Sequence, residues 1–226
     1  MGEGTIIKTE HLSKYYRSGT VSITALDNIS LEIKKGSFTS IMGESGSGKS
    51  TLLHLISGIE RPSKGTIEIL GFRATEFSEN GWIRFRRDHM GYILQEGNLI
   101  GSLTVIKNLV LPHMLFINSE KTATAKAMDA LKTVGLDSRA EVYPHELSGG
   151  QQQKISIVRA LMNDPEILLA DEPTGSLDRK NAAEIMDILK TLNKDRQMTV
   201  VMVTHSPDLA RMTDRIITIR NGRAEG

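Results

Sequence analysis

The chain has 226 residues, a length that fits one domain or one domain with an inserted subdomain. Its 28 Lys and Arg residues nearly balance its 27 Asp and Glu residues, so the net charge of +1 gives no support to a general electrostatic grip on nucleic acid or anionic lipid. The absence of cysteine excludes disulfides and thiolate metal sites and fits a reducing compartment.

Neither the start of the chain nor its most apolar stretch is expected to enter a membrane. Residues Met1–Glu10 have no apolar core, so no secretory signal is predicted. The most apolar stretch, Leu99–Ile117, is interrupted by Lys107, Asn108 and Pro112, whereas a spanning helix needs roughly 20 nearly uninterrupted apolar residues. The sequence therefore predicts no direct membrane insertion.

The N-terminal part of the sequence predicts strands joined by short turns. Residues 29–33 alternate between apolar and polar, which is the period of a half-buried strand. After a Lys-Gly turn, Ser37–Met42 predicts a second strand that leads into a glycine-rich loop. Apolar residues at helical spacing predict a helix over Ser50–Ser57, which Gly58 ends, and a further strand is expected at residues 67–70.

The second half of the sequence changes from helical patterns to an alternation of strands and helices. Residues 102–163 are predicted to be mainly helical. The short apolar runs at 167–170 and 199–203 are typical of buried parallel strands, with a helix through 185–192 between them and a last strand at 216–219. The pattern indicates an α/β fold with a mainly parallel sheet, into which the helical stretch is inserted.

Residues 43–50, GESGSGKS, match the pattern G-x-x-x-x-G-K-[ST] between a predicted strand and a predicted helix. Glycines let successive N–H groups turn inward around phosphate oxygens, and the helix start adds its positive dipole end. We expect Lys49 to reach the β- and γ-phosphates and the Ser50 hydroxyl to bind Mg²⁺. The strand–loop–helix context argues against an ordinary Gly/Ser turn. The residues expected to contact the nucleotide are Gly43, Ser45, Gly46, Ser47, Gly48, Lys49, Ser50 and Thr51.

Two carboxylates follow the predicted buried strand at 167–170. Ligands of open parallel sheets bind beyond the carboxyl ends of the strands, so Asp171 and Glu172 are expected to face the phosphates. Asp171 would hold Mg²⁺ through water, and Glu172 would polarise the attacking water as a general base. The alternative is that the Asp-Glu-Pro sequence only caps the next helix, which is less compatible with a phosphate-binding loop in the same chain.

The segment Leu147–Gln152, LSGGQQ, resembles the signature of the ABC-transporter ATP-binding subunits. Ser148, Gly149 and Gly150 stand at the start of a helix predicted over Gln151–Met162, whose dipole favours an anion. One chain already has a complete phosphate cradle at Lys49, so a second cradle must serve another nucleotide. In this family the second nucleotide belongs to the partner subunit, and the resemblance implies an ATP-dependent homodimer with two ATP molecules between its subunits.

Other positions match the family's motifs in order along nearly the whole chain. Tyr16 matches the aromatic residue that stacks on adenine, and Tyr15 fits the spacing less well. Gln95, after a strand predicted at 90–94, matches the glutamine that touches Mg²⁺ or the attacking water. Asp178 matches the loop that crosses the dimer interface, and His205 matches the switch histidine that contacts the γ-phosphate. By this resemblance Glu172, His205, Gln95 and Lys49 are the catalytic residues.

Within the family, the sequence is most similar to the stand-alone ATPases of lipoprotein-releasing, macrolide-export, cell-division and antimicrobial-peptide-resistance systems. The likeness lies at residues 40–43, 98–99, 111–112 and 151–153. It implies an α/β P-loop NTPase core with a mainly parallel sheet, an N-terminal antiparallel β subdomain and an inserted α-helical subdomain. We expect residues 1–98 and 164–226 to form the RecA-like core with its β subdomain. Residues 99–163 would form the helical subdomain that carries the signature.

The resemblance also implies an activity and its partners. The chain is expected to be an ATP-binding and ATP-hydrolysing subunit, with ATP and Mg²⁺ as cofactors, that powers a separate membrane permease of an exporter or mechanotransmission complex. Through that permease it would lie on the cytoplasmic face of the cell membrane. The apolar stretch Leu99–Ile117 borders the family's docking groove for a permease helix, but it fits the core of the helical subdomain equally well.

Two other functions fit the sequence less well. A GTPase or kinase would need a base-reading N-K-x-D motif, and Asn193–Arg196 has arginine where the aspartate is required. A soluble ABC ATPase that acts on nucleic acid or the ribosome would carry long coiled coils or two fused cassettes. The chain is short for either, and it lacks the basic charge of a nucleic-acid binder.

Overall fold

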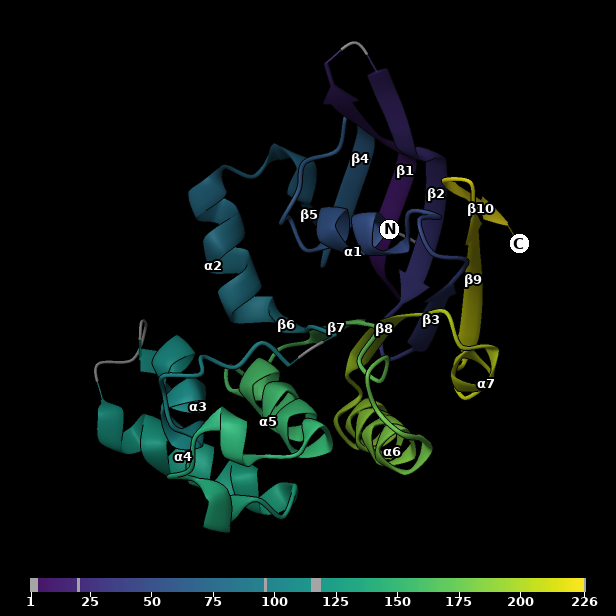
Figure 1. The fold of residues 1–226 in the computed structure, drawn as a ribbon. Coiled ribbons are helices and arrows are strands. Elements are labelled where there is room, and N and C mark those ends of the chain that lie inside the picture. Colours follow the sequence, from purple (N-terminus) through teal and green to yellow (C-terminus); the bar gives the residue numbers. More distant parts are fainter. Residues whose placement is uncertain (1–3, 20, 96, 115–118, 226) are drawn as a thin grey trace.

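The computed structural model describes residues 4–19, 21–95, 97–114 and 119–225 and contains two sheets (Figure 1). The first sheet is antiparallel and has the strand order β2-β1-β4-β5. Its strands are β1 (Thr5–Ser18), β2 (Val21–Lys34), β4 (Lys64–Ile69) and β5 (Phe72–Arg73). This sheet is the N-terminal antiparallel β subdomain that the resemblance implied.

The second sheet has the strand order β10-β9-β3-β8-β7-β6 and is parallel except for β10, which pairs antiparallel with β9. Its strands are β3 (Phe38–Met42), β6 (Met90–Ile93), β7 (Ile167–Asp171), β8 (Thr199–Thr204), β9 (Arg215–Arg220) and β10 (Arg223–Glu225). β3 and β6 from the first half of the sequence pair with strands from the second half, and the parallel pairing confirms the predicted α/β fold with a mainly parallel sheet.

Helices cover the parallel sheet on both faces and form a separate group beside it (Figure 1). The α-helices are α1 (Lys49–Ile56), α2 (Glu79–His89), α3 (Val105–Met114), α4 (Glu120–Thr133), α5 (Gly149–Leu161), α6 (Arg179–Arg196) and α7 (Pro207–Ala210). Three short 3₁₀ helices lie at Ala74–Glu76, Asp137–Arg139 and Pro144–Glu146. Among the helices of the described residues, none is long and apolar enough to cross a membrane.

The buried strands divide their side chains between the two faces of the parallel sheet. In β7, Ile167 and Leu169 belong to the cluster around α1, whereas Leu168 and Ala170 pack toward α5 and α6. β8 alternates in the same way. Successive side chains of a strand point to opposite faces, so an uninterrupted apolar run is what a strand buried on both faces requires.

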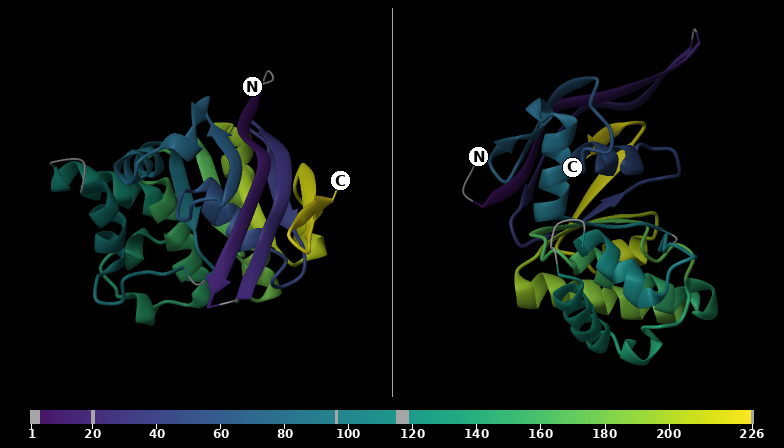
Figure 2. Two further views of the ribbon diagram at one scale, coloured as in Figure 1. Left: turned by 90° about the horizontal axis from the view of Figure 1, so that it is seen from above. Right: turned by 90° about the vertical axis from the view of Figure 1, so that its left-hand side faces the viewer.

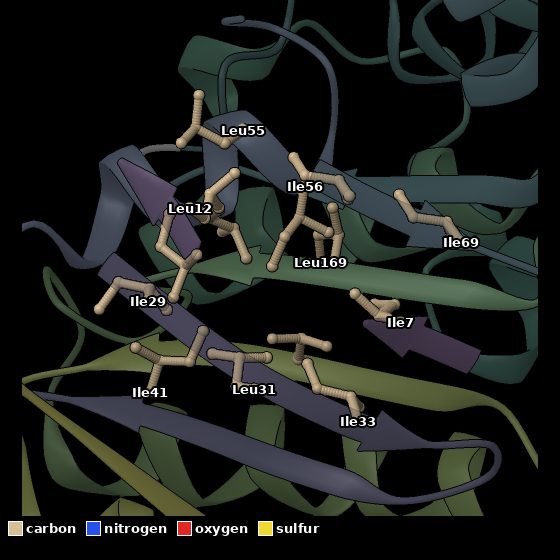
Figure 3. Packing of buried hydrophobic residues seen from close by; sticks show 14 of the residues in the cluster. Ile7, Leu12, Ile29, Leu31, Ile33, Ile41, Leu55, Ile56, Ile69 and Leu169 are labelled. Carbon is tan, nitrogen blue, oxygen red and sulfur yellow. The ribbon is translucent and has the colours of Figure 1, made fainter. Parts of the chain in front are cut away.

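Helix α1 lies between the two sheets, and its apolar side chains contact both. Leu55 and Ile56 are fully buried with Leu12 and Ile29 of the antiparallel sheet and Leu169 of the parallel one (Figure 3). Full burial of such side chains stabilises the fold by about 1.5–3 kcal/mol each. This packing fixes the start of α1, and the loop before it, against the edge where β3 and β7 end.

Three elements differ from the sequence-based expectations. Helix α2 was not predicted, because it is polar over most of its length and buries only Trp82 and Phe85; the side chain of Ser78 caps it by accepting a bond from the N–H of Gly81. Leu70 was expected in a strand but lies after β4 in a turn with φ 53°. The chain continues after the predicted last turn into β10.

Candidate nucleotide site

The loop between β3 and α1 is shaped by glycines that no other residue could replace without movement. A Cβ on Gly43 would lie 2.2 Å from the carbonyl oxygen of Ile219, and one on Gly48 would lie 2.4 Å from that of Ala25. Gly48 also has φ 106°, in the region that favours glycine. Gly43 and Gly48 of the predicted phosphate loop are therefore required by the close approach of neighbouring backbone, whereas Gly46 has open space around it and φ 77°.

The loop borders a hollow of about 480 Å³, which residues 43–47 line together with His205 and residues 218–221. Lys49 is buried, and its Nζ donates to the carbonyl oxygen of Glu44, 2.7 Å away. The Oγ of Ser47 is buried and has no hydrogen-bond partner among the described residues. Ser45 and Gly46 are exposed, and Thr51 is partly buried in the first turn of α1. The loop thus presents polar groups to a pocket at the start of a helix.

Ser50 and Asp171 meet although 121 positions separate them in the sequence. The Ser50 hydroxyl donates to Oδ1 of Asp171 at 3.0 Å. β3 and β7 each pair in parallel with β8, so the residues that follow them lie at the same edge of the sheet. Burial raises the pKa of the Asp171 carboxyl, and the bond from Ser50 opposes this shift. The arrangement places a hydroxyl and a partly buried carboxylate beside Lys49.

Glu172 is held in an unusual backbone conformation beside His205. It has φ 45°, a region that a non-glycine residue rarely adopts, and its N–H donates to the carbonyl oxygen of Val203 at 3.0 Å. The Nδ1 of His205 lies 3.0 Å from Oε2 of Glu172. A Cβ on Gly175 would lie 3.1 Å from Nε2 of Gln95 and 3.3 Å from Oε2 of Glu172. The structure therefore brings Gln95, Glu172 and His205 together at the end of β7.

Tyr16 lies on β1, far along the sequence from the phosphate loop. Its ring is 37% exposed, and its hydroxyl donates to Oε2 of Glu60 at 2.6 Å. The neighbouring Tyr15 has a different contact: the Nζ of Lys64 lies 5.9 Å from the centroid of its ring. Tyr16 is the more exposed of the two aromatic residues, as a stacking platform requires.

Ser148, Gly149, Gly150 and Asp178 form a separate group at the starts of α5 and α6. Ser148 is the N-cap of α5, and Asp178 is the N-cap of α6, where it accepts a bond from the N–H of Asn181 at 2.9 Å. A Cβ on Gly150 would lie 2.3 Å from Oδ1 of Asn181, so the two helix starts are in close contact. Within the described ranges, no hydrogen bond joins this group to the phosphate loop.

The chain on both sides of Gln95 is anchored by two side chains: Gln153, which the sequence indicated only as part of the family likeness, and Arg159, which it did not indicate. Gln153 Nε2 donates to the carbonyl oxygen of Leu94, and the Arg159 guanidinium donates to those of Gly97 and Asn98 at 2.9 and 2.7 Å. Both side chains come from α5. Further along the chain, Asn108 is buried and forms hydrogen bonds with the backbone of Ile100–Thr104. A polar residue in an apolar stretch was a sequence signal for this contact, whereas nothing in the sequence indicated the contacts of Arg159.

The apolar stretch after Gln95 divides between a core and a surface. Val105, Ile106, Leu109 and Val110 are buried in the cluster of α3, α4 and α5. Ile100, Leu111 and Met114 are exposed, with 45%, 42% and 39% of their surface accessible, whereas Leu99 and Leu103 are partly buried. The end of the stretch, 115–117, lies outside the described residues. The buried residues of the stretch fit the core of the helical subdomain, and the exposed ones are compatible with a docking surface.

Comparisons with known proteins agree with this geometry. The family model for "ABC transporter" matches residues 26–175. The lipoprotein-releasing system ATP-binding protein LolD of Chromohalobacter salexigens is 37% identical over 218 residues, which are 96% of this chain and 92% of LolD. The macrolide export ATP-binding/permease protein MacB of Mannheimia succiniciproducens is 41% identical over 217 residues, which are 96% of this chain and 34% of MacB.

A solved structure extends the likeness to the fold. The dimeric structure of a post-hydrolysis state of the ATP-binding cassette MJ0796 of Methanocaldococcus jannaschii, bound to ADP and Pi, superposes with a TM-score of 0.91 at 40% identity and covers 98% of this chain and 97% of its own. The matched region contains the phosphate loop, the signature and both carboxylates. This chain belongs to the ABC transporter family, as an ATP-binding and ATP-hydrolysing cassette.

Proposed function

We propose that Glu172 is the general base of ATP hydrolysis and that His205 holds it in place. The observation that carries this assignment is the pair of 3.0 Å contacts at consecutive residues: Ser50 with Asp171, and His205 with Glu172. A base acts only within hydrogen-bond reach of the water it polarises, and Glu172 directly follows Asp171, whose carboxyl accepts from Ser50 at the end of the phosphate loop. Gln95 lies on the same side and orients the water or the metal.

Mg²⁺ fits the residues at this edge. The Ser50 hydroxyl and the Asp171 carboxylate are hard oxygen donors, and Gln95 adds an amide oxygen nearby. In the part of the chain that the structure describes, no group of three or more His, Cys, Asp or Glu residues could form an all-protein metal cage. Mg²⁺ usually keeps several waters and shares the substrate's phosphates, so a hydroxyl, a carboxylate and an amide are sufficient. The ion would neutralise charge on the phosphates.

We infer the remaining contacts to ATP from the loop and the hairpin. Lys49 and the N–H groups from Gly43 to Thr51 hold the phosphates, because the Lys49 ammonium, which donates to the carbonyl oxygen of Glu44, forms a stronger bond to an anionic phosphate oxygen than to a neutral carbonyl. Tyr16 stacks on the adenine ring. The expected division into a core of 1–98 and 164–226 and a helical subdomain of 99–163 is compatible with three separate apolar clusters, although α5 contributes to two of them.

We further propose that two copies close on two ATP molecules. The Ser148 group has the polar character of an anion site but lies apart from the phosphate loop of its own chain. The cassette MJ0796 is dimeric in a structure with ADP and Pi, which supports this arrangement. The nucleotide of one protomer would then lie against Ser148, Gly149, Gly150 and Asp178 of its partner.

The cassette is proposed to drive a separate permease of the exporter class, on the cytoplasmic face of the cell membrane. LolD is named an ATP-binding protein and matches along 92% of its length, whereas MacB is named ATP-binding/permease and matches along 34%. The exposed residues Ile100, Leu111 and Met114, beside the loop of Gln95, are the proposed docking surface for that permease. No observation favours a nucleic-acid partner.

Ile100→Asp tests the docking surface. The new carboxylate would have to lose its water in a groove, so co-purification with the membrane subunit should fall by about tenfold or more. Basal ATPase of the isolated chain should stay within about twofold, because Ile100 is exposed. Ile216→Asp is the matched control, since Ile216 has a similar exposed fraction, 40%, on β9 at the other side of the sheet. Normal recovery of the Ile100→Asp protein with the membrane subunit would place the coupling surface elsewhere.

A further inference from the structure

The end of the β1–β2 hairpin extends beyond the antiparallel sheet. β1 pairs with β4 only as far as Ser13 and Lys64, whereas its pairing with β2 continues to Ser18 and Val21. Figure 2 shows this part of the hairpin projecting from the molecule. Two strands alone are marginally stable in water, so the position of Tyr16 depends on what else the hairpin contacts.

The connection from α1 to β4 supplies these contacts. Tyr16 Oη donates to Oε2 of Glu60 at 2.6 Å, and Lys14 Nζ lies 3.0 Å from the same oxygen and 2.8 Å from the carbonyl oxygen of Arg61. The N–H of Tyr15 donates to Oγ of Ser63 at 3.0 Å. The hairpin is therefore tied to one short connection, and Glu60 accepts two of its bonds.

Glu60 and its neighbours have the protonation states that these bonds need. Burial on its own would raise the pKa of the Glu60 carboxyl, but the bonds from Tyr16 and Lys14 outweigh it and lower that pKa. Burial and the bond to Glu60 both raise the pKa of the Tyr16 phenol. Tyr16 thus remains a donor and Glu60 a charged acceptor, which is the stronger kind of hydrogen bond. His54 lies 3.4 Å from the other Glu60 oxygen.

Lys14 also restricts the Tyr16 ring. Its Nζ lies 5.0 Å from the ring centroid, within the range of a cation–π contact. One face of the ring is therefore occupied by a cation that Glu60 holds, and a nucleobase can stack on the other face.

We propose that Glu60 is a positioning residue for the nucleobase: it fixes the Tyr16 ring, and with it the base, at a set distance from the phosphate loop. The link to the phosphate loop is the first part of α1, because the Tyr16 hydroxyl also forms a hydrogen bond with the side chain of Thr51, which directly follows Lys49 and Ser50. The N–H of Glu60 donates to the carbonyl oxygen of His54 at 3.2 Å, so Glu60 is held against the same helix that carries the phosphate contacts. The inference rests on the proposed stacking role of Tyr16.

The test uses the full chain and two ligands, MgATP and inorganic tripolyphosphate, which has phosphates but no base. The variants are Glu60→Ala, Glu60→Gln, Tyr16→Ala and the double variant with both alanines. Glu10→Ala is the control, because Glu10 lies on β1, the strand that carries Tyr16, and its carboxylate is paired with Lys8 at 2.7 Å. Melting temperature is measured for each variant, and Glu60→Gln keeps an oxygen that can accept from Tyr16 if Glu60→Ala folds poorly.

We expect Glu60→Ala to weaken MgATP binding by about tenfold, within the range that loss of base–aromatic stacking produces. Its affinity for tripolyphosphate should stay within about twofold, and Glu60→Gln should recover most of the affinity for MgATP. In the Tyr16→Ala background, Glu60→Ala should add less than about twofold, because the ring that it positions is gone.

Four results would overturn the inference. Equal weakening of MgATP and tripolyphosphate by Glu60→Ala would make Glu60 a structural residue of the phosphate site. Independent, multiplying effects of the two alanine substitutions would separate Glu60 from Tyr16. An unchanged MgATP affinity in Glu60→Ala, together with weaker binding in Tyr16→Ala, would exclude the positioning role of Glu60 and leave the stacking role of Tyr16 intact. An unchanged MgATP affinity in Tyr16→Ala would exclude the stacking role, and with it the inference.

Discussion

The two glycine-rich helix starts of this cassette, at α1 and at α5, satisfy their backbone N–H groups in different ways. At α1 the N-cap is Gly48, and no side chain in the described ranges caps the helix. At α5 the N-cap is Ser148, whose Oγ accepts from the N–H of Gln151 while Gln151 Oε1 accepts from the N–H of Ser148. One start is open to a ligand, and the other is already closed by a capping box.

This difference explains how a second phosphate contact can exist without competing with the first. The open start can offer several N–H groups, a buried lysine and a hollow, which together suit tight binding by one chain. The capped start retains the hydroxyl proton of Ser148 and the N–H groups of Gly149 and Gly150; Ser148 and Gly149 are exposed, and Gly150 is buried. In the proposed dimer, such a site adds affinity when the other protomer brings a bound nucleotide to it.

The largest expected effect separates catalysis from binding at the open start. Glu172→Gln keeps the size of the side chain but removes the base, so kcat should fall by roughly 10²- to 10⁴-fold while MgATP affinity changes little. Steady-state hydrolysis and equilibrium binding of nucleotide are the two measurements. Glu166→Gln, before the other end of β7, is the control. Near-normal turnover in Glu172→Gln would remove Glu172 from the role of base.

Lys49→Ala should damage the open start itself. Loss of a charge-assisted bond to phosphate corresponds to about 1.5–3 kcal/mol, so MgATP affinity should fall by roughly 10- to 100-fold. Lys132→Ala, an exposed lysine paired with Asp129 on α4, should bind normally. Titration of each variant with nucleotide checks this. Unchanged affinity of Lys49→Ala would contradict the placement of the phosphates in this loop.

Ser148→Ala should weaken association and leave binding by one chain intact. In the Glu172→Gln background, we expect the dimerisation constant with MgATP to worsen by about tenfold, and the affinity of the monomer for nucleotide to stay within about twofold. Loss of the cap should also cost about 1 kcal/mol of stability. Ser119→Ala removes the corresponding cap of α4 and is the control for that loss. Equal effects of both variants on dimerisation would reduce Ser148 to a structural cap.

The smallest effect is on stability and comes from Asp171. Its raised pKa means that the native state holds the proton more tightly than the unfolded chain, so ionisation above the ordinary pKa of 3.8 destabilises the native state. Asp171→Asn should therefore raise the melting temperature at pH 7 by about 2 °C without nucleotide, and the gain should vanish as the pH falls below 3.8.

Asp178 is the control for this prediction, because its pKa is shifted in the opposite direction from that of Asp171. Bonds from the backbone and side chain of Asn181 lower the pKa of the Asp178 carboxyl, so its contribution is present above its ordinary pKa and is lost as the pH falls. Asp178→Asn should not raise the melting temperature at pH 7. A gain in Asp178→Asn as large as in Asp171→Asn would show that the effect is not due to burial of charge.

Local chemistry made some of the site predictable from the sequence, and long-range packing hid the rest. The loop at 43–50 and the buried runs at β7 and β8 were readable because each needs particular residues at particular spacings. The ties from Arg159 to the loop after Gln95, and from Glu60 to Tyr16, join elements that are 44 to 62 positions apart. No periodicity encodes such pairs, and arginine or glutamate at those positions is equally compatible with a solvated surface.

In the proposed dimer, ATP completes a site that is shared between two chains. Sedimentation of the Glu172→Gln protein at micromolar concentration, with saturating MgATP or with MgADP, tests it most directly, because this variant retains the nucleotide that it binds. ATP that binds only the closed pair shifts association by mass action. We predict a dimer with MgATP and a monomer with MgADP. A monomer with saturating MgATP would show that ATP does not join two copies of this chain.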